Sequence, residues 1–163
     1  MPEHNILDGP VTRTENDPIH DVHRRYWMML VVGVVCVGLY FFYTPASMTS
    51  ALHCDQQETA FSYVIADGAY DTAADLPRTE AAALNAEAVD ILKSYSTSHM
   101  LQQDAVFDSE NAIVIYPDED TNYALYATPD ASYVFALDKS KFRYQVKDDG
   151  NFYQLLEDAL QLK

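Results

Sequence analysis

Oxygen-bearing side chains recur at alternate positions in the segment PDEDTN, residues 117–122. The candidate ligands are Asp118, Glu119, Asp120 and Asn122. Alternating oxygen ligands open a helix-loop-helix calcium site, which also needs glycine at its sixth position and glutamate at its twelfth. Tyr123 and Pro129 occupy those two positions here. The pattern therefore favours a charged hairpin turn, and a loop that binds a cation or a partner is the alternative.

The histidines offer few other metal ligands. His20 and His23 are three residues apart, which would place both on one side of a helix, but no third ligand accompanies them. The pairs His53–Cys54 and His99–Met100 carry soft ligands without the repeated spacing of a metal or haem motif. The chain also contains no nucleophile elbow, no Walker loop and no GxGxxG. The sequence therefore predicts a protein that is not an enzyme and that binds no cofactor or metal.

The chain has two cysteines, and they fall in different parts of it. Cys36 lies in an apolar run, whereas Cys54 is the one cysteine beyond that run. No disulfide is therefore expected within the C-terminal part. We expect Cys54 to be buried, and a bridge to another chain is the alternative.

An uncharged run of 18 residues extends from Tyr26 to Tyr43. As a helix it would reach about 27 Å, close to the ~30 Å of a bilayer's hydrocarbon core. Tyr26 and Trp27 mark one edge and Tyr40 and Tyr43 the other, where amphipathic rings favour the membrane interface. Because 25 residues precede the run and no good cleavage site follows it, we predict a retained transmembrane helix over 26–43 rather than a cleaved signal.

Arg24 and Arg25 directly precede the run and set its predicted orientation. Basic residues beside a span favour the inner side of the membrane. Residues 1–25 are therefore predicted to form a short cytoplasmic (or matrix) tail. Residues 44–163 would lie outside, in the periplasm of a bacterial inner membrane or in the intermembrane space of a mitochondrion. The lipid bilayer is the expected partner of 26–43, and other membrane proteins are expected beside it.

The part from 44 onward is acidic, with 7 Lys and Arg against 20 Asp and Glu, a net charge of −13. Its 120 residues suffice for one modest hydrophobic core. Such a charge should repel nucleic acid and anionic lipid, and it would suit a basic protein partner. The alternative is that the carboxylates serve only solubility.

The acidic part is predicted to combine helices with one sheet. Four β-rich runs occupy 112–116, 122–128, 132–138 and 141–146. The turns between them are too short for anything but antiparallel hairpins, so they predict a four-stranded meander. Helices are predicted at 45–66, at 78–104 and at 148–162. The predicted fold class is α+β, a transmembrane helix followed by a meander with helices on one face.

Local signals set the predicted helix ends. Thr44 and Pro45 would begin the first helix and Gly68 would end it, with a strand over 61–66 as the alternative. Thr79 would cap the second helix.

Two functional hypotheses follow from this organisation. The first is a non-catalytic accessory, assembly or structural subunit, held by its span against a larger membrane complex. The alternative is an exported binding module, either a ligand sensor or a neutraliser of a basic partner. An acidic surface suits the second hypothesis, whereas the absence of any enzyme motif suits both.

Overall fold

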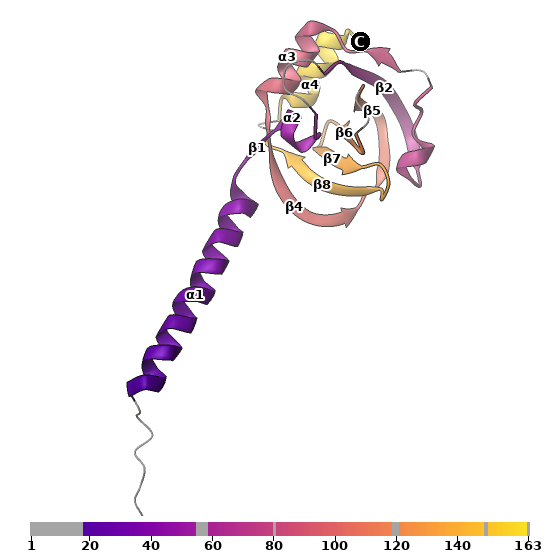
Figure 1. Cartoon of the computed structure of the whole chain (residues 1–163). Helices are drawn as coiled ribbons and strands as arrows, with labels where there is room; N and C mark the ends of the chain where they lie inside the picture. Colours follow the sequence, from indigo (N-terminus) through magenta and orange to yellow (C-terminus); the bar gives the residue numbers. More distant parts are fainter. Residues whose placement is uncertain (1–17, 55–58, 80, 119–120, 149, 163) are drawn as a thin grey trace, which may run out of the picture. The chain divides into compact units, whose positions relative to one another are not determined.

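The computed structural model describes residues 18–54, 59–79, 81–118, 121–148 and 150–162, with the backbone alone for 18–21 (Figure 1). It is a mixed α and β structure. One long helix, α1 (Pro18–Tyr43), has 26 residues. Its first described residue is a proline, which suits a first helical turn because proline lacks the N–H that such a turn leaves unbonded. The remaining elements belong to a compact unit that comprises residues 41–163.

The compact unit contains one eight-stranded antiparallel sheet, whose strands curve round in an arc (Figure 1). The strands are β1 (Ala46–Ser47), β2 (Phe61–Tyr70), β3 (Ala82–Ala83), β4 (Ser96–Asp104), β5 (Phe107–Pro117), β6 (Tyr123–Ala127), β7 (Ser132–Ala136) and β8 (Lys141–Val146). Their order is β1-β4-β8-β7-β6-β5-β2-β3. The helices are α2 (Met48–Ala51), α3 (Ala86–Ser94) and α4 (Phe152–Leu160), with the short 3-10 turn η1 (Ala73–Asp75).

The predicted meander is present as β5 to β8, with each strand paired to the next. Leu125, for example, pairs with Ile115 on one side and Val134 on the other. The prediction of four strands was nevertheless wrong, because four further strands extend the meander at both ends. Helix α4 also lies where its amphipathic pattern predicted a helix.

The predicted helix over 45–66 is another error. Among the residues of this range that the structure describes, only those of α2 form an α-helix. The N-cap of α2 is Ser47, whose side chain accepts the Ser50 N–H. Residues 61–70 form β2, which pairs along its length with β5, so the strand alternative is the correct one. Pairing beside a long buried strand overrides weak helical spacing. Gly68 does not end a helix; it has φ 105° at a bulge in β2, a conformation that glycine adopts without strain.

The helix predicted over 78–104 is much shorter than expected. Helix α3 begins after Asn85, not Thr79, because the Asn85 side chain accepts the Ala88 N–H at 2.8 Å. The segment that follows is β4, paired with β8 and, at its start, with β1. Its Ser, Thr and Gln side chains give the helix little support, so the long-range pairing decides its conformation.

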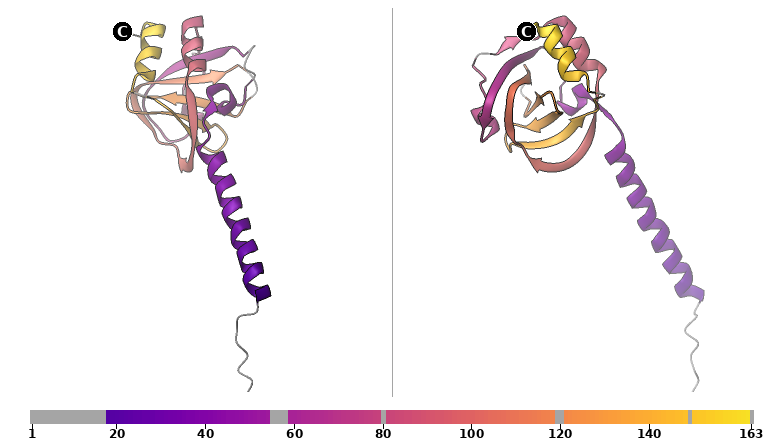
Figure 2. Two further views of the ribbon diagram at one scale, coloured as in Figure 1. Left: turned by 90° about the vertical axis from the view of Figure 1, so that its left-hand side faces the viewer. Right: turned by 180° about the vertical axis from the view of Figure 1, so that it is seen from behind.

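A first core lies between the sheet and all three α-helices of the compact unit. The helical side contributes Met48, Ala51, Leu52, Ala88, Leu92, Phe152, Leu156 and Ala159, and the sheet contributes Phe61, Ile113, Ile115, Leu125, Ala127, Val134 and Val146. Helices α3 and α4 lie side by side in both views of Figure 2. The Asn85 amide nitrogen joins them by donating to the Ala159 carbonyl at 2.7 Å. This side of the sheet agrees with the predicted layer of helices.

The opposite face of the sheet carries a second core, which the sequence did not predict. Alternate residues of the same strands supply it, including Val114, Tyr126 and Phe135. Phe107 packs edge-on against Tyr126 and Phe135, with ring centres 5.2 and 5.0 Å apart. Ala73 and Leu76, which follow β2, also pack into this core. Both faces of the central strands are therefore filled by the protein's own side chains.

Candidate functional site

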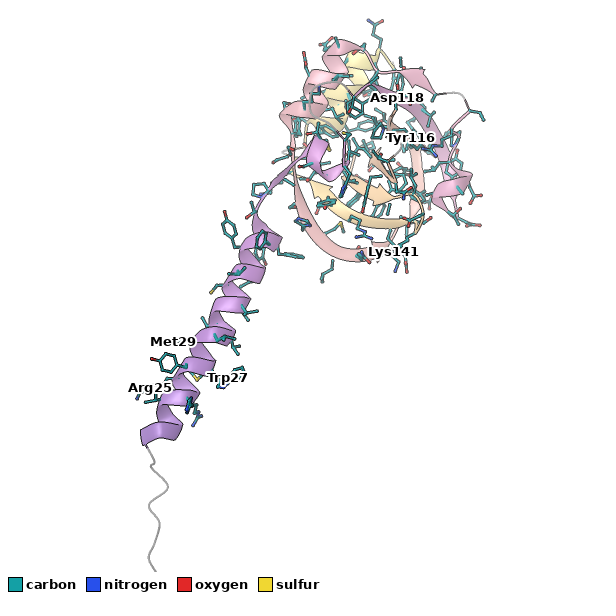
Figure 3. All side chains as sticks on the ribbon, viewed as in Figure 1. Arg25, Trp27, Met29, Tyr116, Asp118 and Lys141 are labelled. Atoms are coloured by element: carbon teal, nitrogen blue, oxygen red, sulfur yellow. The ribbon has the colours of Figure 1, made fainter. Side chains whose placement is uncertain are left out.

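The side chains of α1 beyond its first turn are exposed. The helix over Val22–Tyr43 is long and apolar enough to cross a membrane, and none of its most apolar stretch is buried. Arg25, Trp27 and Met29 project outward from its first half (Figure 3). The aromatic side chains named from the sequence are Tyr26, Trp27, Tyr40 and Tyr43, each between 66% and 70% exposed. They mark the two ends of the apolar stretch, and Arg24 lies beside Arg25 just before it.

The predicted loop at 118–122 joins β5 to β6. Asp118 is exposed, and its N–H donates to the Ala60 carbonyl at 2.9 Å. Asn122 is also exposed, and its carbonyl accepts the Leu137 N–H at 2.8 Å. Glu119 and Asp120 lie outside the described residues. The described part thus forms a hairpin connection anchored at both ends by backbone hydrogen bonds.

The histidines of the other two candidate ligand pairs both contact tyrosine rings. His53 stacks on Tyr123, with ring centres 4.4 Å apart, and His99 lies 4.6 Å from the Tyr144 ring. The Cys54 thiol is partly buried and donates to the Thr49 carbonyl at 3.5 Å. Within the part of the chain that the structure describes, no three His, Cys, Asp or Glu side chains come close enough to share a metal. The His20 side chain is outside that part.

Two tyrosines in the second core, Tyr116 and Tyr126, have unusual surroundings. Each is 3% exposed, and neither hydroxyl meets a hydrogen-bonding group among the described residues. Burial raises the pKa of Tyr116 to about 12, against the opposing effect of the Arg78 guanidinium, which lies 4.7 Å from the ring centre. Burial raises the pKa of Tyr126 to about 12 as well, with a further contribution from Asp108. Burial therefore disfavours the charged phenolate form of both tyrosines.

A polar cleft of about 360 Å³ lies beside α4. Its lining comprises Glu110, Asn111, Pro129, Gly150, Tyr153, Gln154 and Glu157. Tyr153 donates its hydroxyl to the Asn111 carbonyl at 2.7 Å, and burial followed by the Glu157 carboxylate raises the pKa of this tyrosine. The two glutamates make the cleft suitable for a cationic side chain.

The structure also shows a basic strand that the sequence analysis overlooked. Within 139–147 stand Lys139, Lys141, Arg143 and Lys147, with no acidic residue among them. Four of the seven Lys and Arg beyond residue 43 thus fall in nine positions along β8. A count of charge along the acidic part, rather than over the whole of it, would have found this segment.

Comparisons with protein-family models, with curated proteins and with solved structures find no match to this chain. Its function is accordingly inferred from its own residues. They provide an exposed apolar helix, an acidic compact unit with one basic strand, and a sheet whose two faces are both filled.

Proposed function

We propose that the chain is a single-pass membrane protein whose acidic compact unit lies outside the membrane and serves as a non-catalytic accessory or assembly subunit of a membrane protein complex. The observation that carries this proposal is the Val22–Tyr43 helix, which is apolar, sufficiently long and unburied. An exposed apolar surface of this size has a large unfavourable hydration free energy in water, and a bilayer removes it. Arg24 and Arg25 favour an inner location for the tail that precedes the helix.

The start of the compact unit favours a retained anchor over a cleaved signal. Cleavage after the small residue Ala51, for example, would remove β1 and the Met48 side chain. Met48 and Ala51 are both 0% exposed and belong to the first core. Deletion of a buried methionine side chain alone typically costs about 2–5 kcal/mol. A chain that keeps its helix also keeps these core residues, and its compact unit is therefore more stable than that of a cleaved chain.

An accessory role suits the way the sheet is packed. The two cores occupy both faces of the central strands, so binding to a large partner would use the outer surface and the apolar helix. Side chains along α1 can pack against the spans of other proteins. The inner membrane of a bacterium or mitochondrion is the location that this proposal implies.

The polar cleft beside α4 favours a second candidate function, an exported binding module for a basic partner. Glu110 and Glu157 line it together with the phenol of Tyr153. A Lys or Arg side chain of a partner would find charge complementarity there. In this case the compact unit, and not the helix, would select the partner.

Purification of the intact chain in a mild detergent, followed by identification of bound proteins, tests the proposal. The matched variant replaces the residues of 28–39 by leucine and retains the flanking Arg and aromatic residues. An accessory subunit held by its span should lose its membrane partners in this variant. Proteins that stay bound to the leucine variant but are lost from a variant with both Glu110→Gln and Glu157→Gln would favour the binding module. Absence of any bound protein from both forms would refute the subunit role.

A further inference from the structure

The charge of the compact unit is unevenly distributed. The basic strand, defined above as Lys139, Lys141, Arg143 and Lys147, is flanked in sequence by Asp138 and Asp148. Asp104 adds a third carboxylate, with its Oδ1 atom 3.6 Å from the Lys141 Nζ atom. The strand thus has four cations against three carboxylates, whereas the rest of 44–163 has three against 17. This segment therefore departs from the repulsion of anions that the composition of 44–163 as a whole predicts.

The two most exposed large apolar side chains described beyond Tyr43 adjoin this strand. Leu101 is 76% exposed and Val106 is 70% exposed. Leu101 lies in a bulge of β4, between the pairs that join His99 to Tyr144 and Gln103 to Phe142, so it faces the position of Arg143. Bulges re-aim side chains in this way. The exposed Leu101 thus lies opposite Arg143 in the register of the two strands.

Val106 adjoins the other end of the basic strand. The N–H of its neighbour Ala105 donates to the Ser140 carbonyl at 2.9 Å, between Lys139 and Lys141. Lys141 lies at the edge of the compact unit, on the far side from Asp118 (Figure 3). Exposed apolar side chains next to basic ones are the combination that binds anionic membrane surfaces.

The cations on this surface are available for a further partner. The Asp104 side chain is 91% exposed and that of Lys141 is 40% exposed, so their ion pair is solvated and weak. The Gln102 amide lies against the Arg143 guanidinium, at 3.0 Å from its Nε atom. Neutral Gln102 orients Arg143 without neutralising it. Lys139 and Lys147 are both exposed.

Chain connectivity keeps the basic strand close to the end of α1, whatever the orientation of the helix. Ala46 follows Tyr43 by three residues, a path of at most about 11 Å. Ala46 pairs with Thr97, which pairs in turn with Val146, and each step between neighbouring strands adds about 5 Å. Val146, next to Lys147, therefore lies within about 21 Å of the last residue of α1.

We propose that Leu101 and Val106 insert into the interface of the bilayer in which α1 is anchored, while the basic strand contacts the phosphates of anionic phospholipids. This inference rests on the proposed membrane anchor and adds a second contact to it. Arg143 and the lysines donate charge-assisted hydrogen bonds to phosphate oxygens. The carboxylate-rich remainder of the unit is repelled by the same headgroups and turns away from them. The compact unit thereby acquires a defined orientation on the membrane.

Fluorescence quenching in vesicles tests this contact with the intact chain. In a Trp27→Phe background, Leu101→Trp supplies a single indole, and Leu155→Trp on α4 is the matched control because Leu155 is also partly exposed, at 42%. The probe membrane is brominated phosphatidylcholine, with or without phosphatidylglycerol. We expect at least a twofold fall in emission for Leu101→Trp in anionic vesicles and none for Leu155→Trp. Lys139→Gln together with Lys147→Gln should abolish that fall, and Lys93→Gln on α3 should leave it unchanged.

Three results would overturn the inference: an unquenched Leu101→Trp indole in anionic vesicles, equal quenching without phosphatidylglycerol, or insensitivity to the two lysine substitutions. Val106→Trp provides a second probe if Leu101→Trp disturbs the fold, as judged from its thermal melt. The native Trp27 of the unsubstituted chain separates this inference from the proposed anchor. Quenching of Trp27 without quenching of the Leu101→Trp indole refutes the second contact alone. An unquenched Trp27 refutes the anchor itself.

Discussion

Replacement of Asn85 by alanine should be among the most destabilising single changes of a polar side chain in the compact unit. The side chain accepts the Ala88 N–H at 2.8 Å, capping α3, and donates to the Ala159 carbonyl at 2.7 Å, which joins α3 to α4. Loss of an N-cap costs about 1 kcal/mol, and loss of a partly buried hydrogen bond costs about as much again. Asn85→Ala should therefore lower the free energy of unfolding by about 2 kcal/mol. For a domain of this size that corresponds to a fall of about 8 °C in Tm.

Asn151 provides a matched control at the N-cap of α4. Its side chain makes no capping hydrogen bond, because Asp148 Oδ1 accepts the N–H groups of Gly150, Asn151 and Phe152 instead. Asn151→Ala should change stability by less than about 0.5 kcal/mol. Asn85→Ser should recover about half of the loss, since serine can cap α3 but is too short to reach α4.

Urea unfolding of a fragment over 44–163, followed by circular dichroism, measures these differences. The fragment should unfold in one cooperative transition, because its two cores are formed almost entirely within it. Equal effects of Asn85→Ala and Asn151→Ala would refute the assignment of the cap and of the link between α3 and α4. A broad transition in the unsubstituted fragment would show that the unit requires a partner or the anchor.

Two further outcomes are expected. Because Tyr116 and Tyr126 each have a pKa of about 12 when folded and about 10 when unfolded, their contribution to stability is complete below pH 10 and is lost as the pH rises toward 12. Absorbance of phenolate at 295 nm should therefore show two of the 12 tyrosines ionising only as the fold is lost, and ordinary titration of all 12 near pH 10 would contradict their burial. Replacement of the three carboxylates at 118–120 by amides should leave the fold and the set of bound proteins unchanged if the charge serves solubility, with association followed at low and high salt. Loss of a bound protein, or a calcium-dependent rise in Tm that the substitution removes, would instead make the loop a binding site.

The meander and α4 could be predicted because their signals are local. The turn segments PDA and KS separate runs such as SYVFA and KFRYQ, whose β propensity agrees with the final structure. Strand β2 could be predicted only as an alternative, over 61–66, since the spacing of Leu52, Phe61 and Val64 also fits a helix. Its conformation depends on pairing with β5, about 50 residues further along the chain. The conformation of β4 also depends on long-range pairing. Its residues have no strong local preference for a strand, and hydrogen bonding to β8 and β1 on either side makes them one.

The candidate functional surfaces also differ in whether local sequence signals reveal them. The apolar helix and its basic and aromatic ends are evident from composition alone. The neighbourhood of Leu101 and Arg143 requires the β4–β8 register and its bulge, which no local pattern encodes. The second core also escaped prediction, because burial of both sheet faces replaces the expected alternation of buried and exposed residues.

Protease treatment of intact spheroplasts (or mitoplasts) tests the retained anchor and its orientation most directly. Protease added outside should destroy an epitope at the C-terminus and leave a protected fragment that contains the tail and the helix up to about Tyr43, still in the membrane. The basic pair Arg24 and Arg25 predicts this arrangement. Protection of the C-terminal epitope from the protease would show that the compact unit lies on the inner side, opposite to the predicted orientation. If the chain found before protease is added already lacks the tail and the helix, the helix has been removed by processing, which would contradict the anchor.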